Sequence, residues 1–124
     1  MPCRIVVADD NQDSADTLAV LLELEGHEVR TALNGQQALN IILTFKPQVA
    51  LLDIAMPGMD GYEVAKRVRS IPWREPITLI ALTGHGQPQD KARAIAAGFD
   101  HHLLKPVAPG IVEDVIVQTG CDAA

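Results

Sequence analysis

The fold is decided by the stretch VALLDIAMPGMDG, residues 49–61. Its first four residues are apolar and predict a strand that is buried on both faces, while Pro57 and Gly58 predict a surface turn. Asp53 stands where the strand meets the turn. Ligands bind at the carboxyl ends of the strands in open parallel α/β sheets, so Asp53 is the first candidate for chemistry.

Three other apolar runs also end in polar side chains. Asp9 and Asp10 follow the N-terminal run Ile5-Val6-Val7-Ala8, and Thr83 and Lys105 close two later runs. The four strand ends are far apart in sequence. In a parallel sheet they would still meet at one edge, so these side chains are expected to converge.

Apolar and amphipathic segments alternate five times along the chain, which predicts β/α units. The first, third and fourth strands are the apolar ones and should be central. Gly26 and Gly98 stand where helix C-terminal caps belong, and Pro88 suits a first turn. We predict strands near 4–9, 28–32, 48–53, 77–82 and 100–104, and helices near 13–25, 35–45, 61–70, 88–97 and 109–118.

Two helices have apolar faces that can be assigned from their spacing. The helix over 35–45 places Ala38, Ile41, Ile42 and Phe45 on one face, which predicts packing on the sheet. The helix over 13–25 is more apolar than a single core-facing stripe requires. A broad core face, which we favour, and a surface for a helical partner both explain this excess, which comes from Leu18, Val20, Leu21, Leu22 and Leu24.

Composition limits the classes of protein. A length of 124 residues with 48% hydrophobic content suits one domain with a proper core. The net charge of -6 and the dispersed ten basic residues argue against a nucleic-acid surface. Cys3 and Cys121 lack a CxxC spacing, so neither a disulfide framework nor a zinc site is indicated, and a reduced, cytoplasmic setting is expected. No segment predicts a membrane span or a signal peptide.

The motifs taken together resemble the receiver domain of two-component response regulators. They are Asp9-Asp10, Asp53 with the turn over 56–61, Thr83-Gly84 and Lys105-Pro106. The match covers nearly the whole chain, so residues 1–124 are expected to form a single receiver domain. The resemblance implies an α/β fold of the flavodoxin-like (CheY-like) type, a doubly wound five-stranded parallel sheet of order 2-1-3-4-5 with five helices.

The resemblance also implies the chemistry. Asp53 would be the phosphoacceptor, whose carboxylate oxygen attacks a phosphohistidine. Asp10 and Asp53 would bind Mg²⁺ directly, Asp9 would bind it through water, and the backbone carbonyl of Ala55 would be a further oxygen ligand. The alternative for the acidic residues after the first strand is helix capping, and Asp13 is the residue we expect to cap.

Electrostatics favours a site over a purely structural role. Two like charges about 4 Å apart repel by roughly 4 kcal/mol at an effective dielectric near 20, and three carboxylates make three such pairs. A divalent cation and an ammonium group would offset this repulsion. Lys105 resembles the family lysine that pairs with the phosphoacceptor, and the family's Lys-Pro bond is cis. Thr83 resembles the hydroxyl that binds the phosphoryl group and switches its loop, and Gly84 suits a close backbone approach.

The chain departs from the family at the position that couples Thr83 to the fifth strand. The usual aromatic residue is replaced by His102, so an aromatic rotamer switch is not carried over. Neighbouring His101 would be exposed on the opposite face of the strand, which argues against a two-histidine chelate. Ala55 and His85 occupy positions that tune phosphoryl lifetime in the family, and Ala55 should leave the site open to water.

The implied partner is a histidine kinase or a histidine phosphotransfer domain, without nucleic acid or membrane. It would dock over Gln12, Ser14 and Ala15 together with Pro106 and Val107, and a phosphorylation-dependent dimer is compatible with the family. The domain would assist its own phosphorylation without being a turnover enzyme, either free-standing or as the receiver of a hybrid sensor kinase. The alternative is a phosphorylation-independent interaction module. A magnesium-dependent hydrolase would need an acid where Ala55 stands.

Overall fold

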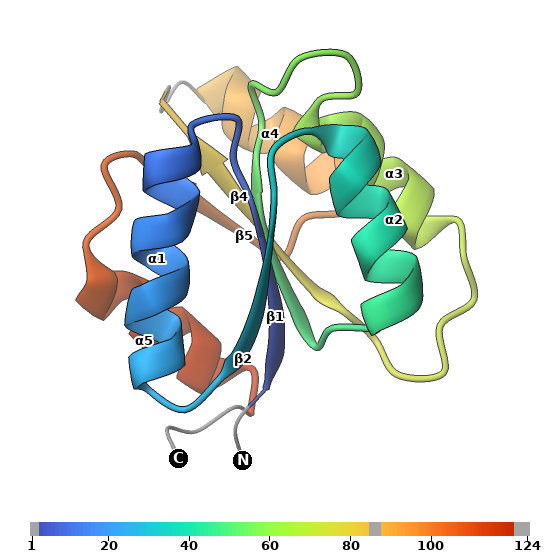
Figure 1. Cartoon of the computed structure of the whole chain (residues 1–124). Coiled ribbons are helices and arrows are strands. Elements are labelled where there is room, and N and C mark those ends of the chain that lie inside the picture. Colours follow the sequence, from blue (N-terminus) through green and yellow to red (C-terminus); the bar gives the residue numbers. More distant parts are fainter. Residues whose placement is uncertain (1–2, 85–87, 121–124) are drawn as a thin grey trace.

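The computed structural model describes residues 3–84 and 88–120 and consists of five β/α units (Figure 1). All ten predicted elements are confirmed, with bounds that differ from the predicted ones by one residue or none. The strands are β1 (Arg4–Ala8), β2 (Glu28–Ala32), β3 (Val49–Asp53), β4 (Thr78–Thr83) and β5 (His101–Leu104). The helices are α1 (Gln12–Leu24), α2 (Gly35–Phe45), α3 (Gly61–Arg69), α4 (Pro88–Ala97) and α5 (Pro109–Gln118).

The sheet is parallel, and its strand order is β2-β1-β3-β4-β5, as the resemblance implied. The chain moves to one side of β1 to form β2 and then returns to the other side to form β3. The strand order therefore reverses at β1 and β3, and a crevice for ligands is expected at their carboxyl ends. The register pairs Ala8 with Leu52, so Asp9 follows β1 beside the end of β3.

Helices cover both faces of the sheet (Figure 1), and a hydrophobic core lies under each layer of helices. Successive residues of the central strands point to opposite faces, so each strand supplies both cores. On β3, Ala50 and Leu52 pack in the core under α2, α3 and α4, while Val49 and Leu51 pack in the core under α1 and α5. This double burial explains why β1, β3 and β4 have continuous apolar sequences.

The termini of the helices follow local chemistry, with one correction. Asn11, and not Asp13, caps α1: its side chain accepts a hydrogen bond from the Ser14 N–H at 3.0 Å. Asp13 lies inside the first turn, where a carboxylate still favours the helix dipole. The predicted glycine caps are confirmed, because Gly26 and Gly98 follow α1 and α4 with φ of 96° and 108°.

The helix faces agree with prediction for α2 and disagree in part for α1. Ala38 and Ile42 of α2 are fully buried on the sheet, and Ile41 and Phe45 pack at the edge of the same core. On α1, however, Val20 is 54% and Leu24 is 77% exposed. The predicted broad core face is therefore wrong for these two side chains, because α1 packs on the sheet along a narrower stripe of Ala15, Ala19 and Leu22.

Cys3 precedes β1 and is buried. Its backbone N–H donates to Nδ1 of the buried His27 at 3.0 Å. Cys3 is disulfide-bonded. The expectation of reduced cysteines is therefore wrong for Cys3, because the spacing of cysteines along a chain does not report which of them meet in the fold. Within residues 3–84 and 88–120, no helix has the length and apolar content needed to cross a bilayer.

Candidate functional site

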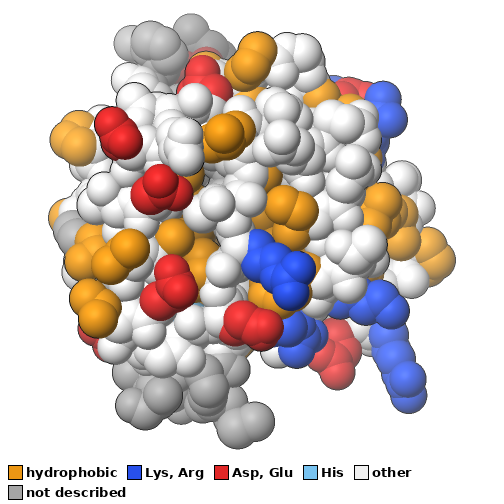
Figure 2. Space-filling view, in the orientation of Figure 1, with side chains coloured by type: hydrophobic (Ala, Val, Ile, Leu, Met, Phe, Trp, Pro, Cys, Tyr) orange, Lys and Arg blue, Asp and Glu red, His pale blue; other side chains and the backbone are white. Residues whose placement is uncertain are grey.

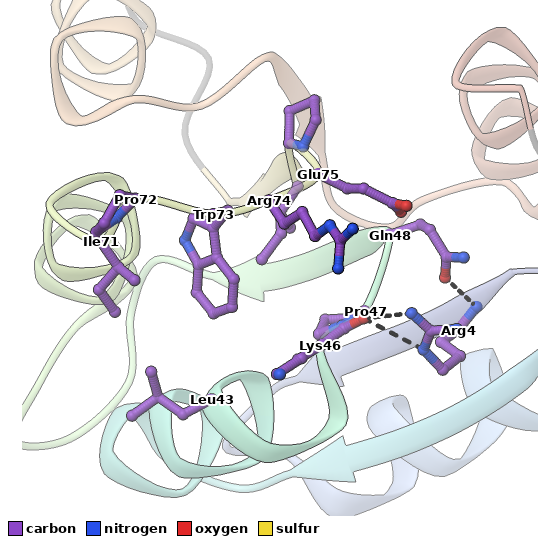
Figure 3. A pocket seen from close by; sticks show the side chains of 12 residues that line it. Arg4, Leu43, Lys46, Pro47, Gln48, Ile71, Pro72, Trp73, Arg74 and Glu75 are labelled. Carbon is purple, nitrogen blue, oxygen red and sulfur yellow. Dashed lines mark hydrogen bonds between the residues drawn. The ribbon is translucent and has the colours of Figure 1, made fainter.

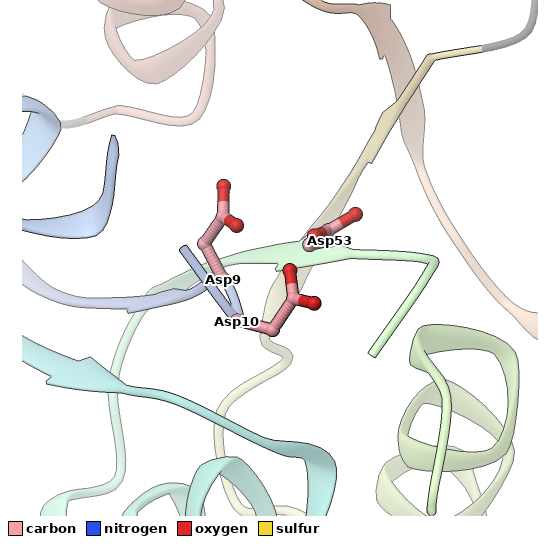
Figure 4. A group of neighbouring side chains, drawn as sticks. All are labelled: Asp9, Asp10 and Asp53. Atoms are coloured by element: carbon pink, nitrogen blue, oxygen red, sulfur yellow. The ribbon is translucent and has the colours of Figure 1, made fainter. Parts of the chain in front are cut away.

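Three carboxylates meet at the crevice predicted by the strand order (Figure 4). Asp9 and Asp10 follow β1, and Asp53 is the last residue of β3. One carboxylate oxygen of each residue lies within 4.8 Å of the others. The expectation that residues about forty positions apart in sequence would converge here is thus confirmed by the geometry.

The two buried carboxylates share one ammonium group. Asp9 is 3% and Asp53 is 4% exposed. Nζ of Lys105 lies 2.9 Å from Oδ2 of Asp9 and 3.1 Å from Oδ2 of Asp53. The remaining oxygens accept backbone hydrogen bonds, Oδ1 of Asp9 from Asn11 and Oδ1 of Asp53 from Ala55. Asp10 is exposed, so the cluster opens to solvent on that side.

Lys105 reaches the cluster from the connection after β5. Its backbone N–H donates to the Thr83 carbonyl at 2.8 Å, which fixes this connection to the end of β4. The Lys105–Pro106 bond is cis, as the resemblance implied. The sequence therefore identified Lys105, but its placement against two carboxylates depends on three strand ends meeting.

For Asp53 and for Lys105, burial and the neighbouring charges shift the pKa in opposite directions. Burial raises the pKa of Asp53, and the hydrogen bonds from Lys105 and Ala55 only partly oppose this shift. Burial alone would lower the pKa of Lys105, but its hydrogen bonds to Asp9 and Asp53 raise that pKa above its ordinary value. Lys105 therefore stays an ammonium, and its charge favours the ionised form of Asp53, which burial disfavours.

The donor set fits a hard divalent cation. Three carboxylates supply oxygen ligands only, which suits Mg²⁺ or Ca²⁺, and an exposed Asp10 leaves room for the waters that Mg²⁺ retains. Ala55 is exposed directly beside Asp53, to which its N–H is already bonded. The cluster has three negative charges against one ammonium, so a bound divalent cation would come close to neutralising it.

Thr83 ends β4 and is 5% exposed. It stands next to the carboxyl end of β3, because the register pairs Asp53 with Leu82. Gly84 follows, and apart from its chain neighbours no atom of residues 3–84 and 88–120 lies within 4 Å of where its Cβ would be.

His102 lies under α4 in a place that the sequence singled out. It pairs with Ala81, and its Nε2 is buried without a hydrogen-bond partner in the described part of the chain. His101 pairs with Ile80 on the other face of the sheet, so the two imidazoles do not form one site. His101 is half-buried, whereas we expected it to be exposed. His85 lies outside the described residues.

The sequence included Gly61 in the turn motif over 56–61, but its close contact with β3 was not predicted. Gly61 begins α3 close to the end of β3, and a Cβ on it would lie 2.7 Å from the Asp53 carbonyl oxygen. Asp60 caps the same helix, with its side chain accepting from the Glu63 N–H at 2.9 Å. Asp60 was a usable signal for the start of this helix, because Asp is a preferred N-cap residue.

Comparison with known proteins agrees with the fold. Residues 5–116 match the response regulator receiver domain family. The chain is 41% identical over 105 residues to an uncharacterized 14.6 kDa protein in the sodA1 3' region of Leptolyngbya boryana, covering 85% of this chain and 80% of that protein. The structure resembles the chemotaxis protein CheY4 of Vibrio cholerae, with a TM-score of 0.89, 26% identity, and coverage of 96% of this chain and 99% of that chain.

The chain therefore belongs to the response regulator receiver domain family, a family of signalling domains. It is also 35% identical over 105 residues to the phosphate regulon transcriptional regulatory protein PhoB of Pseudomonas aeruginosa. That match covers 85% of this chain and 46% of PhoB, so the chain spans about half the length of that regulator.

Proposed function

We propose that this chain is a phosphoacceptor receiver, in which Asp53 takes a phosphoryl group from a phosphohistidine of a histidine kinase or phosphotransfer domain. The observation that carries the proposal is the contact of one ammonium, Lys105, with the buried carboxylates of Asp9 and Asp53 beside the exposed Asp10. Stability alone does not favour this crowding of charge, whereas phosphoryl transfer requires it.

In the proposed reaction, an Asp53 carboxylate oxygen attacks phosphorus, and the bond from phosphorus to the imidazole nitrogen breaks. The bonding electron pair stays on that nitrogen. The Ala55 N–H, already bonded to Oδ1 of Asp53, orients the carboxylate. Lys105 then pairs with a phosphoryl oxygen as a point charge. The products are an aspartyl phosphate and a free histidine.

Asp10 and Asp53 would hold Mg²⁺ directly, with Asp9 acting through water and Ala55 through its carbonyl. When bound, Mg²⁺ supplies neutralisation of the charge on the phosphoryl oxygens. The protein's own contribution is to position the acceptor and to keep Lys105 charged. The domain promotes its own phosphorylation and need not turn over substrate as an enzyme does.

A cavity next to the cluster supports the docking of the phosphodonor protein. It has a volume of about 560 Å³ and lies between α1 and the connection from β5 to α5. Ser14, Leu18 and Leu21 line it from α1, and Pro106 and Val107 line it from the connection. An apolar cavity that also includes Asp9 and Lys105 suits a partner that must bring an imidazole to Asp53.

Signal output is proposed to follow from Thr83. A phosphoryl group on Asp53 would draw the Thr83 hydroxyl inward, and the segment around α4 and β5 would respond. His102, with its partnerless buried Nε2, would replace the family's aromatic residue in that response. Phosphorylation favours the active state only by as much as the phosphoryl group binds that state better. We assign residues 1–124 to one receiver domain and place its phosphorylation in the cytoplasm.

Intact-protein mass spectrometry after incubation with acetyl phosphate and Mg²⁺ tests the acceptor without the unknown kinase. Wild type and Asp114→Asn, which changes an exposed carboxylate on α5, should each gain one phosphoryl adduct. Asp53→Asn should gain none. Equal labelling of Asp53→Asn would remove Asp53 as the acceptor, and no adduct on any variant would favour a phosphorylation-independent interaction module.

A further inference from the structure

A second cavity lies at the opposite edge of the sheet, at the amino ends of the strands (Figure 3). Its volume is about 540 Å³. Arg4 contributes from the start of β1, Gln48 from just before β3, and Ile77 from just before β4. The rest of the lining comes from the end of α2 and from the connection between α3 and β4, residues 71–77. The acidic cluster is at the carboxyl ends of the same strands, so the two sites face away from each other.

The centre of this cavity is apolar, and its Trp73 is anchored by a hydrogen bond and by packing. Trp73 packs against the core under α2 and α3, and its Nε1 donates to the Val68 carbonyl at 2.8 Å. The polar edge of the indole is thus satisfied inside the protein, and the ring is held in one orientation. Leu43, at 42% exposure, lies opposite the ring (Figure 3). Pro47 and Ile71 complete an apolar floor.

The rim of the cavity is cationic. Lys46 and Arg74 are exposed, and within residues 3–84 and 88–120 neither makes an ion pair. Arg4 adds a third cation, held by hydrogen bonds to the Phe45 and Lys46 carbonyls. Among the described residues that line the cavity, Glu75 is the one carboxylate. The net charge here is positive on a chain whose net charge is -6.

This surplus belongs to a wider separation of charge. Figure 2 shows acidic side chains mainly over α1, on the left, and basic side chains mainly to the right of them, toward the lower end of α2. Neither α1 nor α5 contains a lysine or an arginine. A partner that approaches the cavity is therefore selected for negative charge.

The arrangement of these groups decides what kind of ligand fits. Sites for small molecules place a few polar groups deep inside an enclosed pocket. Here the depth is apolar and the charges stand on exposed side chains at the rim, which is the anatomy of a protein interface. Tryptophan and arginine are also the residues that most often dominate binding energy at such interfaces.

We propose that this cavity docks an acidic peptide segment of a partner protein. An apolar or aromatic side chain of the segment packs on Trp73 and Leu43, and flanking carboxylates pair with Lys46 and Arg74. Because the cavity is at the opposite edge from Asp53, a tethered partner leaves the acidic cluster free. The site is independent of the phosphoryl chemistry proposed above.

The test is selection from a displayed library of random short peptides on the wild-type chain, followed by titration of the enriched peptides. Trp73 is the only tryptophan in the sequence, so its fluorescence reports occupancy of this cavity directly. The variants are Lys46→Glu and Arg74→Glu, both at exposed positions where unfolding is not expected. Lys91→Glu, exposed on α4 and remote from the cavity, makes the same change in net charge.

Enriched peptides should be acidic with an apolar or aromatic anchor and should shift the Trp73 emission. Each charge reversal at the rim should lower the affinity for these peptides by about tenfold, whereas Lys91→Glu should change it little. High salt should also lower the affinity of the wild type. The proposal is overturned if no peptide is enriched, if the enriched peptides are not acidic, or if Lys46→Glu and Arg74→Glu bind them as wild type does.

Discussion

Nζ of Lys105 lies 3.1 Å from Oδ2 of Asp53, and this contact joins the ends of the third and fifth strands. The same nitrogen contacts Asp9, so one cation offsets the repulsion between two buried carboxylates. At an effective dielectric near 20, each close charge pair is worth roughly 4 kcal/mol before desolvation is subtracted. The stability and the chemistry of this edge of the sheet are therefore linked through Lys105.

Replacing Lys105 by methionine should destabilise the Mg²⁺-free protein. The change leaves Asp9 and Asp53 buried without a cation, and the side chain of Lys105 is only 31% exposed. We expect the free energy of unfolding in urea to fall by about 1–3 kcal/mol, less than for a fully buried pair. Lys91→Met, at an exposed helical position, should stay within about 0.5 kcal/mol of wild type. Equal values for the two variants would mean that Lys105 does not stabilise the carboxylates.

Mg²⁺ should raise the thermal unfolding midpoint of the wild type, because an ion that binds only the folded state stabilises it by mass action. Asp10→Asn removes one of the three carboxylates and should lower the affinity for Mg²⁺ by about tenfold or more. Calorimetric titration measures this affinity directly. Asp16→Asn, exposed on α1 away from the cluster, is the matched control. Unchanged affinity in Asp10→Asn would remove Asp10 from the metal site.

Stability should depend on pH through Glu113. Burial raises the pKa of its carboxyl above the usual 4.5, and the charge of Glu25 adds to this shift, with His27 opposing it. The folded state then binds the proton more tightly than the unfolded state. The stability of the wild type therefore falls as pH rises from about 4.5 through the raised folded pKa, and it stays lower above that value.

Glu113→Gln removes this penalty. Near neutral pH the variant should be more stable than wild type, by less than about 1 kcal/mol because solvent screens part of the effect. Below the unfolded pKa the two proteins should have the same stability. Urea unfolding across this pH range measures the difference, and a constant gap at all pH values would exclude Glu113 as its source.

Thr83→Ala should uncouple phosphorylation from the structural response. The variant keeps Asp53 and should still take the phosphoryl adduct, but the phosphate-dependent change in amide exchange over α4 and β5 should be weaker. Thr78→Ala, at the other end of the same strand, should respond as wild type does. A full response in Thr83→Ala would show that its hydroxyl does not transmit the signal.

Gly61→Ala should disturb the end of β3. The new Cβ would stand 2.7 Å from the Asp53 carbonyl oxygen and 2.9 Å from the Ile54 Cα, and both are backbone atoms that cannot move alone. We expect a loss of about 1–3 kcal/mol in unfolding free energy, together with slower labelling by acetyl phosphate. Gly110→Ala meets no atom within 4 Å and lies in α5, so it should not destabilise the protein. If Gly61→Ala changed neither the unfolding free energy nor the rate of labelling, the backbone would accommodate the new Cβ without cost.

The sequence by itself determined the ten elements, because the local signals agreed with one another. Apolar runs marked the buried strands, and glycines such as Gly26 and Gly98 marked helix ends that need a positive φ. It also identified Asp53 and Lys105, since charged residues directly after buried runs must lie at the edge of a sheet. The strand order was predicted from the resemblance to receiver domains. Periodicity could not predict it, because it does not show which strands are neighbours in the sheet.

Tertiary structure decided which groups meet. The capping of α1 by Asn11 instead of Asp13 depends on the path of the chain out of β1, and both residue types have similar intrinsic preference for the cap. The exposure of Leu24 depends on how much of α1 the sheet can cover. The cavity at Trp73 joins segments from β1, α2 and the α3–β4 connection. The spacing of residues in a sequence reports the periodicity of a single helix or strand. These contacts instead join residues that are far apart in the sequence, and only the packing of whole elements brings them together.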